Sequence, residues 1–264
     1  MHPDMVYEYP IWAIGLLLMC VAVLGAVLIE LCARRVVPNE LRRRHNDVAA
    51  AIFSIIGVTY AVLLAFVAML AWEGYNRAKA ASYAEAALIG DVYNLSAGLG
   101  DPERSSIRDD IIGYARHVVT VEWPMQAEGK TVNESSVYLD RLNTTTLAPR
   151  AGATDGDLHS LLLQLVARVW DARQERLLAA QTSIPDIMWF VMIAGGALTI
   201  AFGSFLGAPS LRMQLAMSAV LAASGTLVLI LIIALSNPFR GDFRVSTAPF
   251  EHVLSRMAEG ETGH

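Results

Sequence analysis

The chain has 264 residues, of which 55% are hydrophobic and 17% are charged, and its formal net charge is −5 at pH 7. Average soluble domains hold fewer apolar and more charged residues, so this composition is typical of a protein with membrane-embedded helices. A mild acidic balance without a clustered basic face excludes nucleic acid as an expected partner.

Four apolar runs dominate the chain, and they occur as two close pairs separated by a long polar stretch. Crossing a hydrocarbon core of roughly 30 Å takes about 20 helical residues, and each run is long enough to do so. The sequence therefore predicts an all-α membrane protein with four transmembrane helices in two hairpins and a helical extramembrane domain between spans two and three. The predicted spans are residues 11–33, 48–72, 187–207 and 213–236. The predicted parts are a leader with the first hairpin (1–72), the helical domain (73–185), the second hairpin (186–236) and a C-terminal tail (237–264).

The first apolar run is expected to be a retained span and not a cleaved signal peptide. Residues 1–9 contain acidic side chains but no lysine or arginine, whereas a signal peptide begins with a basic region. The two cysteines of the chain, Cys20 and Cys32, lie in or beside this span. On one helix they are about 18 Å apart, which is too far for a disulfide bond between them.

Arginines in the loop between spans one and two predict the orientation of the chain. This loop holds Arg34, Arg35, Arg42, Arg43 and Arg44, and the leader holds no basic residue. Basic residues in short loops stay in the cytoplasm, so we expect the helical domain and the tail on the periplasmic side of a bacterial inner membrane. Basic residues near the other ends of the spans weaken the bias; they are Arg77, Lys79, Arg173, Arg176, Arg240 and Arg244.

The helical domain is expected to begin as a continuation of span two, because nothing breaks the helix between Glu73 and Leu99. A second helix is predicted to end at Pro124. Its apolar stripe comprises Ile107, Ile111, Tyr114, Val118 and Val121. A weak helix is expected at 134–142, and a last long helix is expected to begin at Asp157. The apolar face predicted for that last helix comprises Leu161, Leu165, Val169 and Ala172.

Small residues in span three predict close helix packing. They recur every four residues at Gly195, Thr199, Gly203 and Gly207. Such a stripe lets the backbone of another helix approach closely. The partner helix belongs either to the same four-helix protomer or to a neighbouring protomer around a central axis, with span two lining that axis.

Spans two, three and four contain no Asp, Glu, His, Lys or Arg. Pumps and proton-coupled transporters need ionisable groups inside the membrane as relays, so their absence weighs against active transport. A passive pore gated by a hydrophobic constriction needs none, and neither does a membrane anchor. Only Glu30 approaches a span, and it lies one turn from Arg34.

No catalytic, cofactor-binding or metal-binding residues are predicted, and the chain is not expected to be an enzyme. The histidines are not at metal-ligand spacing, and neither a zinc-protease, a nucleophile-elbow nor a phosphate-loop motif occurs. Glu122-Trp123-Pro124 places a carboxylate beside an aromatic ring. We interpret it as a helix terminus whose tryptophan packs against the domain or the bilayer.

Several segments together resemble a known family. They are His45-Asn46-Asp47 after the arginine-rich loop, the stretch 57–66 in span two, Trp72-Glu73, Glu122-Trp123-Pro124, and the stretch 237–241 after span four. This set resembles the bacterial bestrophin-like domain family, and the resemblance covers nearly the whole chain.

A more distant similarity links this family to the bestrophins, which are pentameric anion channels. Their protomers have four spans, a helical domain between spans two and three, and a second span that lines a hydrophobic neck. An Asn-Pro-Phe-Gly segment follows their span four; Asn237, Pro238 and Phe239 match it, but Arg240 replaces the glycine. The acidic cluster that follows in calcium-gated members is reduced here to Asp242, which puts calcium gating in doubt. Bestrophins also hold the helical domain in the cytoplasm, whereas the arginines of this chain predict the opposite side.

These observations lead to two hypotheses. The first is a homo-oligomeric, passive ion channel in the lipid bilayer, with span two as the pore wall. Its predicted pore-lining residues are Ser54, Gly57, Thr59, Tyr60, Ala61 and Phe66. The alternative is a non-conducting membrane scaffold or envelope sensor, whose spans anchor a helical domain that binds a partner.

Overall fold

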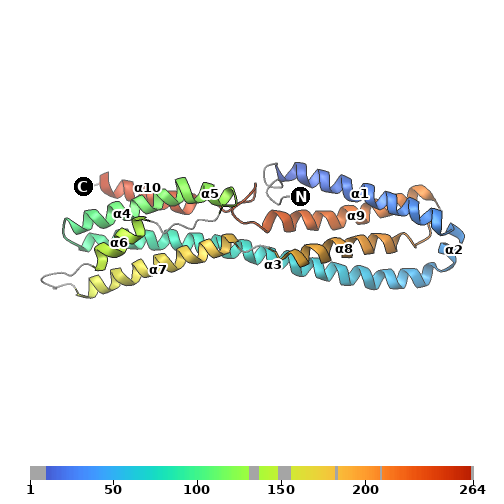
Figure 1. Ribbon diagram of the computed structural model, residues 1–264, viewed down its shortest axis with the longest axis horizontal. Helices are drawn as coiled ribbons and strands as arrows, with labels where there is room; N and C mark the ends of the chain where they lie inside the picture. The colour runs from blue at the N-terminus through green and yellow to red at the C-terminus, as the bar shows by residue number, and fades with distance from the viewer. Residues whose placement is uncertain (1–9, 131–136, 148–155, 182–183, 209, 263–264) are drawn as a thin grey trace. The chain divides into compact units, whose positions relative to one another are not determined.

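The computed structural model describes residues 10–130, 137–147, 156–181, 184–208 and 210–262. Within these ranges all regular secondary structure is helical, which confirms the predicted all-α class (Figure 1). The chain divides into two compact units. Unit 1 comprises Met1–Glu73 and Ser183–Ser236, and unit 2 comprises Gly74–Thr182 and Asn237–His264.

Among the described residues, four helical stretches are long and apolar enough to cross a membrane, which confirms the predicted number of membrane-length helices; their most apolar parts lie in unit 1. Its helices are α1 (Ile11–Val36), the short α2 (Asn39–Arg44), the first half of α3 (Asn46–Leu95), α8 (Asp186–Gly203) and α9 (Leu211–Leu235). The most extensive packing joins α1 to α9, and α8 contacts both (Figure 1). α8 ends at Gly203, before the predicted end of span three at residue 207.

α3 is 50 residues long, and the boundary between the two units falls within it. At 1.5 Å per residue its length is about 75 Å, more than twice the roughly 30 Å of a hydrocarbon core. The predicted continuation beyond Glu73 is confirmed as far as Leu95, after which a 3-10 turn over Ser96–Gly98 follows. Alanine-rich sequence between residues 78 and 87 favours this continuation, because alanine has the highest helix propensity.

Unit 2 packs the second half of α3 with shorter helices around one apolar core. These are α4 (Glu103–His117), a π-helical turn (Val118–Glu122), α5 (Trp123–Ala127), α6 (Val137–Leu147), α7 (Gly156–Gln181) and α10 (Ala248–Thr262). The core includes Ile107, Ile111, Tyr114 and Val118, all without solvent exposure. These four positions of the predicted stripe are confirmed.

Val121, the last residue of that stripe, is 40% exposed instead of buried. The cause is the π-helical turn, which holds one more residue than an α-helical turn and shifts the register of the helix. Glu122 takes the inward position in its place. The chain also stays helical through Pro124 to Ala127, because a proline in the first turn of α5 needs no backbone donor. The predicted helix end at Pro124 is therefore wrong.

α7 buries a face that differs in part from the predicted one. Val169 and Ala172 are buried as expected, but Leu161 is 46% exposed and Leu162 is buried beside it. The same buried face carries two arginines further along, which apolar periodicity does not identify. The weak helix predicted at 134–142 is present as α6 from Val137 to Leu147, and residues 134–136 lie outside the described ranges.

The C-terminal tail folds as part of unit 2. After Asn237 and Pro238 the chain turns, and the amide of Val245 donates to the carbonyl of Pro238 at 2.7 Å. Phe239 from this turn and Phe250 from α10 are buried, and their rings meet the ring of Trp123 edge-on at centroid distances of 5.2 and 5.5 Å. All three rings belong to the apolar core of unit 2. Of the two predicted surroundings of the tryptophan, the domain and the bilayer, the first is confirmed.

Candidate functional site

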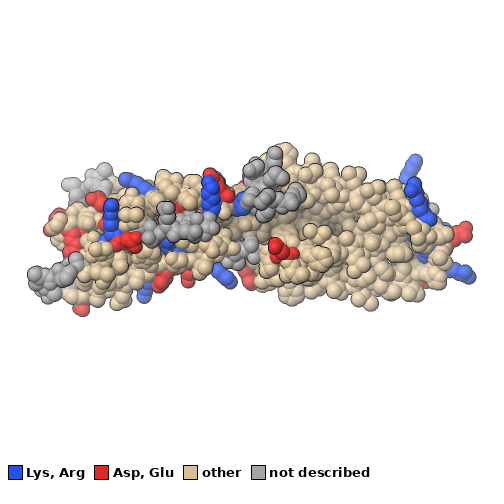
Figure 2. Space-filling view, viewed as in Figure 1, with Lys and Arg blue, Asp and Glu red and all other residues tan. Residues whose placement is uncertain are grey.

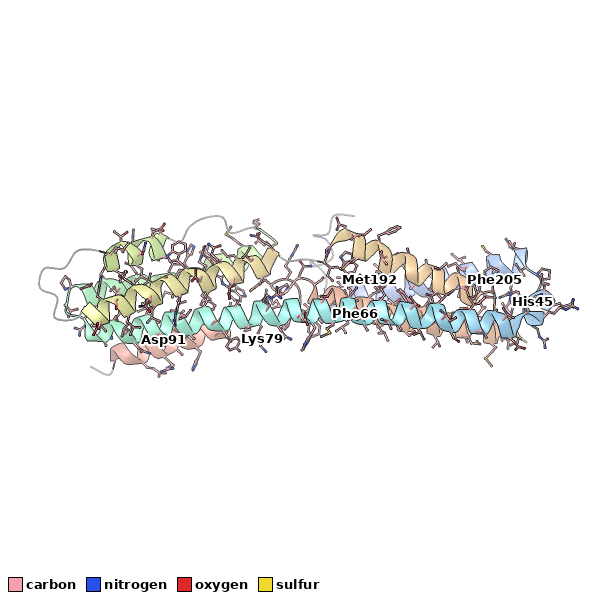
Figure 3. All side chains as sticks on the ribbon, turned by 90° about the horizontal axis from the view of Figure 1, so that it is seen from below. His45, Phe66, Lys79, Asp91, Met192 and Phe205 are labelled. Atoms are coloured by element: carbon pink, nitrogen blue, oxygen red, sulfur yellow. The ribbon has the colours of Figure 1, made fainter. Side chains whose placement is uncertain are left out.

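The membrane segment of α3 has one packed face and one open face. Leu64, Val67 and Ala71 are buried within unit 1. The opposite side, here called the outer face of α3, is apolar and exposed; it comprises Ile55, Val58, Val62, Phe66 and Met69. Figure 3 marks Phe66 on this helix, about six turns after His45, which precedes its first residue. The outer face is therefore an uncharged, unpaired surface within a single chain.

The predicted pore-lining residues do not share one face of α3. Ser54, Thr59, Ala61 and Phe66 are exposed, whereas Gly57 and Tyr60 are half-buried. The Tyr60 hydroxyl donates to the carbonyl oxygen of Met192 at 3.0 Å, which turns its ring toward α8. Because six residues separate Tyr60 from Phe66, the two side chains leave the helix about 120° apart around its axis. The hydroxyls of Ser54 and Thr59 each donate to a carbonyl four residues earlier in their own helix, at 2.9 Å.

The small residues of α8 lie close to side chains of α3. A Cβ atom added to Gly195 would lie 2.9 Å from the ring of Tyr60, and one added to Gly203 would lie 3.3 Å from the ring of Phe53. Thr199 donates its hydroxyl to the carbonyl of Gly195 at 2.8 Å. Gly207 lies beyond the end of α8, where an added Cβ would meet the backbone nitrogen of Arg43 at 2.8 Å. The helical stripe itself thus ends at Gly203.

An apolar cleft of about 580 Å³ lies between the four membrane-length helices of unit 1. Glycine and alanine residues together with larger apolar side chains from all four helices line it, and its lining includes no charged residue. The hydroxyls of Thr199, Ser224 and Thr226 border the cleft, but each donates to a carbonyl of its own helix. A cleft of this kind suits an apolar occupant and not a hydrated ion.

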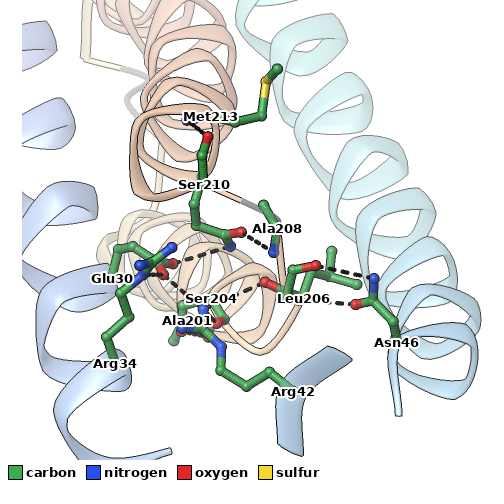
Figure 4. Close-up of polar contacts among 12 residues, drawn as sticks. Glu30, Arg34, Arg42, Asn46, Ala201, Ser204, Leu206, Ala208, Ser210 and Met213 are labelled. Carbon is green, nitrogen blue, oxygen red and sulfur yellow. Dashed lines mark hydrogen bonds and ion pairs between the residues drawn. The ribbon is translucent and has the colours of Figure 1, made fainter. Parts of the chain in front are cut away.

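Charged side chains of unit 1 gather at the end that carries α2, as the face seen in Figure 2 shows. Among the charged side chains at this end, Glu30 is fully buried and is the shared partner of three other side chains. One carboxylate oxygen accepts from Arg42 at 2.7 Å and from Arg34 at 3.3 Å, and the other accepts from Gln214 at 3.3 Å (Figure 4). These four residues are here called the Glu30 cluster. Sequence reasoning identified only Glu30 and Arg34, which share one helix; Arg42 and Gln214 come from α2 and α9 and had no local signal.

The Glu30 cluster also fixes the turn between α8 and α9. Arg42 donates to the carbonyl oxygens of Ser204 and Leu206, and Gln214 accepts from the amide of Ala208 at 2.9 Å (Figure 4). Next to it, Asn46 accepts from the amide of Gly207 at 2.9 Å and donates to the carbonyl of Gly207 at 3.3 Å. Side chains from α2, α3 and α9 therefore hold one backbone turn, and Glu30 of α1 binds two of these side chains, Arg42 and Gln214.

A second buried polar group lies inside unit 2, centred on Arg176 of α7. Its guanidinium donates to Glu85 of α3 at 2.6 Å and to Glu122 at 2.6 Å, and it also donates to Gln126 at 3.2 Å. Arg173 donates to Glu122 at 2.8 Å, and the Tyr114 hydroxyl donates to Glu85 at 2.5 Å. We call Glu85, Tyr114, Glu122, Arg173 and Arg176 the Arg176 network; all five side chains are buried.

Electrostatics within this network favour the charged forms of the ion pairs. Burial raises the pKa of Glu122, but the charges of Arg176 and Arg173 outweigh it and hold that pKa below its ordinary value. Burial lowers the pKa of Arg176, yet the charge of Glu85 more than compensates, and the net pKa is raised. Burial and the charge of Glu85 raise the pKa of Tyr114 well above its ordinary value, so that this hydroxyl stays a donor.

Sequence reasoning missed the Arg176 network. Its two arginines are three residues apart on α7, and its carboxylates come from α3 and the π-helical turn, so no local motif joins them. The sequence signal was the Glu122-Trp123-Pro124 segment, whose carboxylate is drawn inward by the π-helical turn. The guanidinium of Arg176 also lies over the Trp123 ring, 5.6 Å from its centroid.

Within the described parts of the chain, no three His, Cys, Asp or Glu residues gather where they could hold a metal ion. The buried carboxylates Glu30, Glu85 and Glu122 are each bound to arginine. Both cysteines are exposed and free. The two polar clusters are thus ion-pair assemblies, and the open apolar surface of α3 is the remaining feature to explain.

The whole architecture has known counterparts. The structure is similar to crystal structures of point variants of a bacterial bestrophin homologue from Klebsiella pneumoniae. One has a TM-score of 0.69 at 14% sequence identity and covers 93% of this chain and 99% of that chain. Another has a TM-score of 0.70 at 13% identity and covers 91% of this chain and 99% of that chain. At these identities the likeness shows the fold. No curated protein matches the chain by sequence.

The family assignment rests on the sequence itself. The bestrophin-like domain family matches residues 20–250, from within α1 to within α10. This match includes the membrane-length helices of unit 1 and most of unit 2, and it confirms the resemblance drawn from the sequence segments. The chain belongs to the bestrophin-like domain family.

Proposed function

We propose that the chain assembles as a homo-oligomer in the bacterial inner membrane and conducts ions passively through an axial pore lined by the outer face of α3. The observation that carries this proposal is that face itself: about four turns of exposed, uncharged apolar surface on the longest helix of the chain. Family membership supports it, because bestrophins are anion channels of the same fold. Anions are accordingly the expected permeant ions.

The chemistry of the outer face suits a hydrophobic constriction. Such a constriction gates by dewetting and requires no ionisable group in the pore wall. α3 carries no charged side chain between residues 48 and 72, which fits passive conduction and leaves no relay for coupling to protons. Phe66 is the proposed constriction residue, because its ring is on the outer face. Tyr60, predicted alongside it, is bonded to α8 and is proposed to position that helix instead.

Orientation is proposed from the arginines at the α2 end of unit 1. Arg34, Arg35 and Arg42–Arg44 concentrate positive charge there. Positive charge near short loops is retained in the cytoplasm, so α2 is proposed to lie on the cytoplasmic side and unit 2 on the periplasmic side.

Thiol accessibility tests the pore wall. In a chain with Cys20 and Cys32 replaced by serine, we expect Val62→Cys and Phe66→Cys to react with membrane-impermeant charged thiol reagents and to lose ion flux. Leu24→Cys on α1 is the matched control, because Leu24 is equally exposed and apolar but is proposed to face lipid. Equal reaction of Phe66→Cys and Leu24→Cys would contradict the proposed pore wall.

The alternative function is a non-conducting scaffold or envelope sensor that presents unit 2 to a partner. It is supported by α1, whose exposed face is as apolar as that of α3, since lipid contact alone would account for both surfaces. A cryo-EM reconstruction of the purified full chain separates the two functions. A ring of subunits with α3 on the axis supports the channel, whereas a monomer, or a dimer without an axial opening, supports the scaffold.

A further inference from the structure

The Glu30 cluster contains more positive charge than its one carboxylate can neutralise. Arg34 and Arg42 both bind Glu30, so the cluster has two guanidinium groups for one buried anion. The Arg42 side chain is 1% exposed. Guanidinium stays charged in proteins, and an uncompensated buried charge is strongly destabilising. The Glu30 cluster therefore holds one positive charge more than its carboxylate balances, on the fully buried Arg42 and the partly exposed Arg34, and it has the charge to bind a second anion.

The hydrogen bonds of the Glu30 cluster also indicate an additional anionic partner. Among the described residues, Nε and Nη1 of Arg42 and Nη2 of Arg34 are buried without any hydrogen-bond partner. Meanwhile Nη2 of Arg42 alone is shared by Glu30 and the carbonyls of Ser204 and Leu206. A buried donor without an acceptor costs about 1–3 kcal/mol. The cluster thus has three donors available, on two cations, for an additional acceptor.

We propose that these donors form a binding site for a phosphate group. Several oxygens on one anionic centre match the fork of donors on guanidinium, which is why arginine is preferred for phosphate recognition. A phosphate group would reach the cluster at Arg34, because the side chain of Arg34 is 23% exposed. Its neighbours Arg35, Arg43 and Arg44 are exposed and add to the positive potential at this end of the membrane helices. The phosphate comes from an anionic lipid headgroup or from free phosphate, and the site does not depend on whether the chain conducts ions.

The test measures how much each phosphate source stabilises the full-length protein against heat. One arm titrates inorganic phosphate into protein in phosphate-free, non-ionic detergent. The other arm compares nanodiscs of phosphatidylglycerol with nanodiscs of phosphatidylcholine. A stabilisation in the first arm identifies a free anion, and one confined to phosphatidylglycerol identifies a lipid headgroup. No stabilisation in either arm overturns the proposal.

Variants assign the effect to the cluster. Arg34→Gln should weaken the apparent affinity about tenfold, which corresponds to the loss of roughly 1.4 kcal/mol. Arg35→Gln is the matched control, since it removes the same charge from an exposed neighbour and should leave the affinity within about twofold. An equal loss in both variants would mean diffuse attraction and would overturn the site. Should Arg34→Gln not fold, Arg34→Lys keeps the charge but removes the fork, and it should also weaken binding.

Glu30→Gln should change the phosphate affinity in the opposite direction. The amide keeps the shape of the side chain but removes the competing anion, so phosphate should bind more tightly than to the unchanged protein. The variant should also be less stable in phosphate-free detergent and should recover most of that loss when phosphate is added. A purely structural role of Glu30 predicts a loss of stability that phosphate does not restore.

Discussion

The charge of Arg176 cannot be removed under physiological conditions, because guanidinium stays protonated, and its side chain is fully buried in unit 2. Two carboxylates, Glu85 and Glu122, hold it from different elements of the chain. A buried network of this kind contributes little net stability compared with an apolar core, but removing Arg176 leaves Glu85 without its cation and Glu122 with Arg173 alone. The Arg176 network thus joins α3, the π-helical turn and α7 by buried ion pairs.

The first prediction at this scale concerns the loss of the central cation. Arg176→Met leaves two buried carboxylates facing an apolar side chain, and we expect the free energy of unfolding to fall by about 3–5 kcal/mol. Urea unfolding of the detergent-solubilised protein, followed by circular dichroism, measures this. Arg168→Met on the exposed side of the same helix is the control and should change stability by less than about 0.5 kcal/mol. Similar losses in both variants would show that the network does not act as described.

The second prediction concerns acid. The pKa of Glu122 is lower in the folded protein than its ordinary value, because Arg176 and Arg173 outweigh the effect of burial. Its ion pairs therefore contribute stability above the unfolded-state pKa of about 4.3, and this contribution is lost as the pH falls through the folded-state pKa. Thermal unfolding is measured across the acid range. As the pH is lowered, the unfolding temperature should fall more steeply for the unchanged protein than for Glu122→Gln. The exposed Glu175→Gln should retain the steep fall; a flat profile in the unchanged protein would contradict this account.

At the scale of elements, aromatic side chains of α3 pack against α8 at positions that are glycine in α8. Gly195 faces the ring of Tyr60, and Tyr60 is bonded to the carbonyl of Met192, so ring and helix backbone fit one another. Gly57 of α3, by contrast, has no atom within 4 Å of the place where a Cβ would lie. The two glycines have opposite environments within the same unit.

This contrast gives the third prediction. Gly195→Ala places a methyl group against the Tyr60 ring, and overpacking of this kind costs about 1–3 kcal/mol. Gly57→Ala meets nothing and should gain about 0.5–1 kcal/mol from the lower backbone entropy of alanine in the unfolded chain. The two variants are unfolded in mixed detergent micelles with increasing dodecyl sulfate. The dodecyl sulfate fraction at the unfolding midpoint should fall for Gly195→Ala and rise for Gly57→Ala. Equal shifts would mean that α3 and α8 do not pack as described.

The elements also show what the sequence predicts and what it does not. Apolar runs and the continuous helix through Glu73 were predictable, because length, hydropathy and the absence of helix breakers are local properties. The inward turn of Glu122 was not, because a π-helical turn leaves no apolar pattern of its own. Arg42 and Gln214 were missed for a different reason: their partner Glu30 is distant in sequence, and only the fold brings the three together. The grouping of Tyr60 with Phe66 has another cause: six residues on a helix place them about 120° apart, so the sequence already separates them, and the structure adds that Tyr60 is bonded to α8.

On the scale of the whole molecule, the side of the membrane that holds unit 2 is the fourth prediction. The arginines near α2 favour the cytoplasm for that end, so we expect unit 2 in the periplasm. Alkaline phosphatase, which is active only outside the cytoplasm, should be active when inserted at Gly152 and inactive at Glu40. The reverse result would place unit 2 in the cytoplasm.

The central claim is that the oligomer conducts ions, and single-channel recording tests it most directly. The purified full chain is reconstituted in planar lipid bilayers, with Phe66→Ala and Leu24→Ala recorded under the same conditions. The account predicts discrete unitary conductance steps that persist without calcium, an altered conductance in Phe66→Ala, and an unchanged one in Leu24→Ala. Bilayers that remain silent across salts, pH values and calcium levels would contradict the claim and favour the non-conducting scaffold.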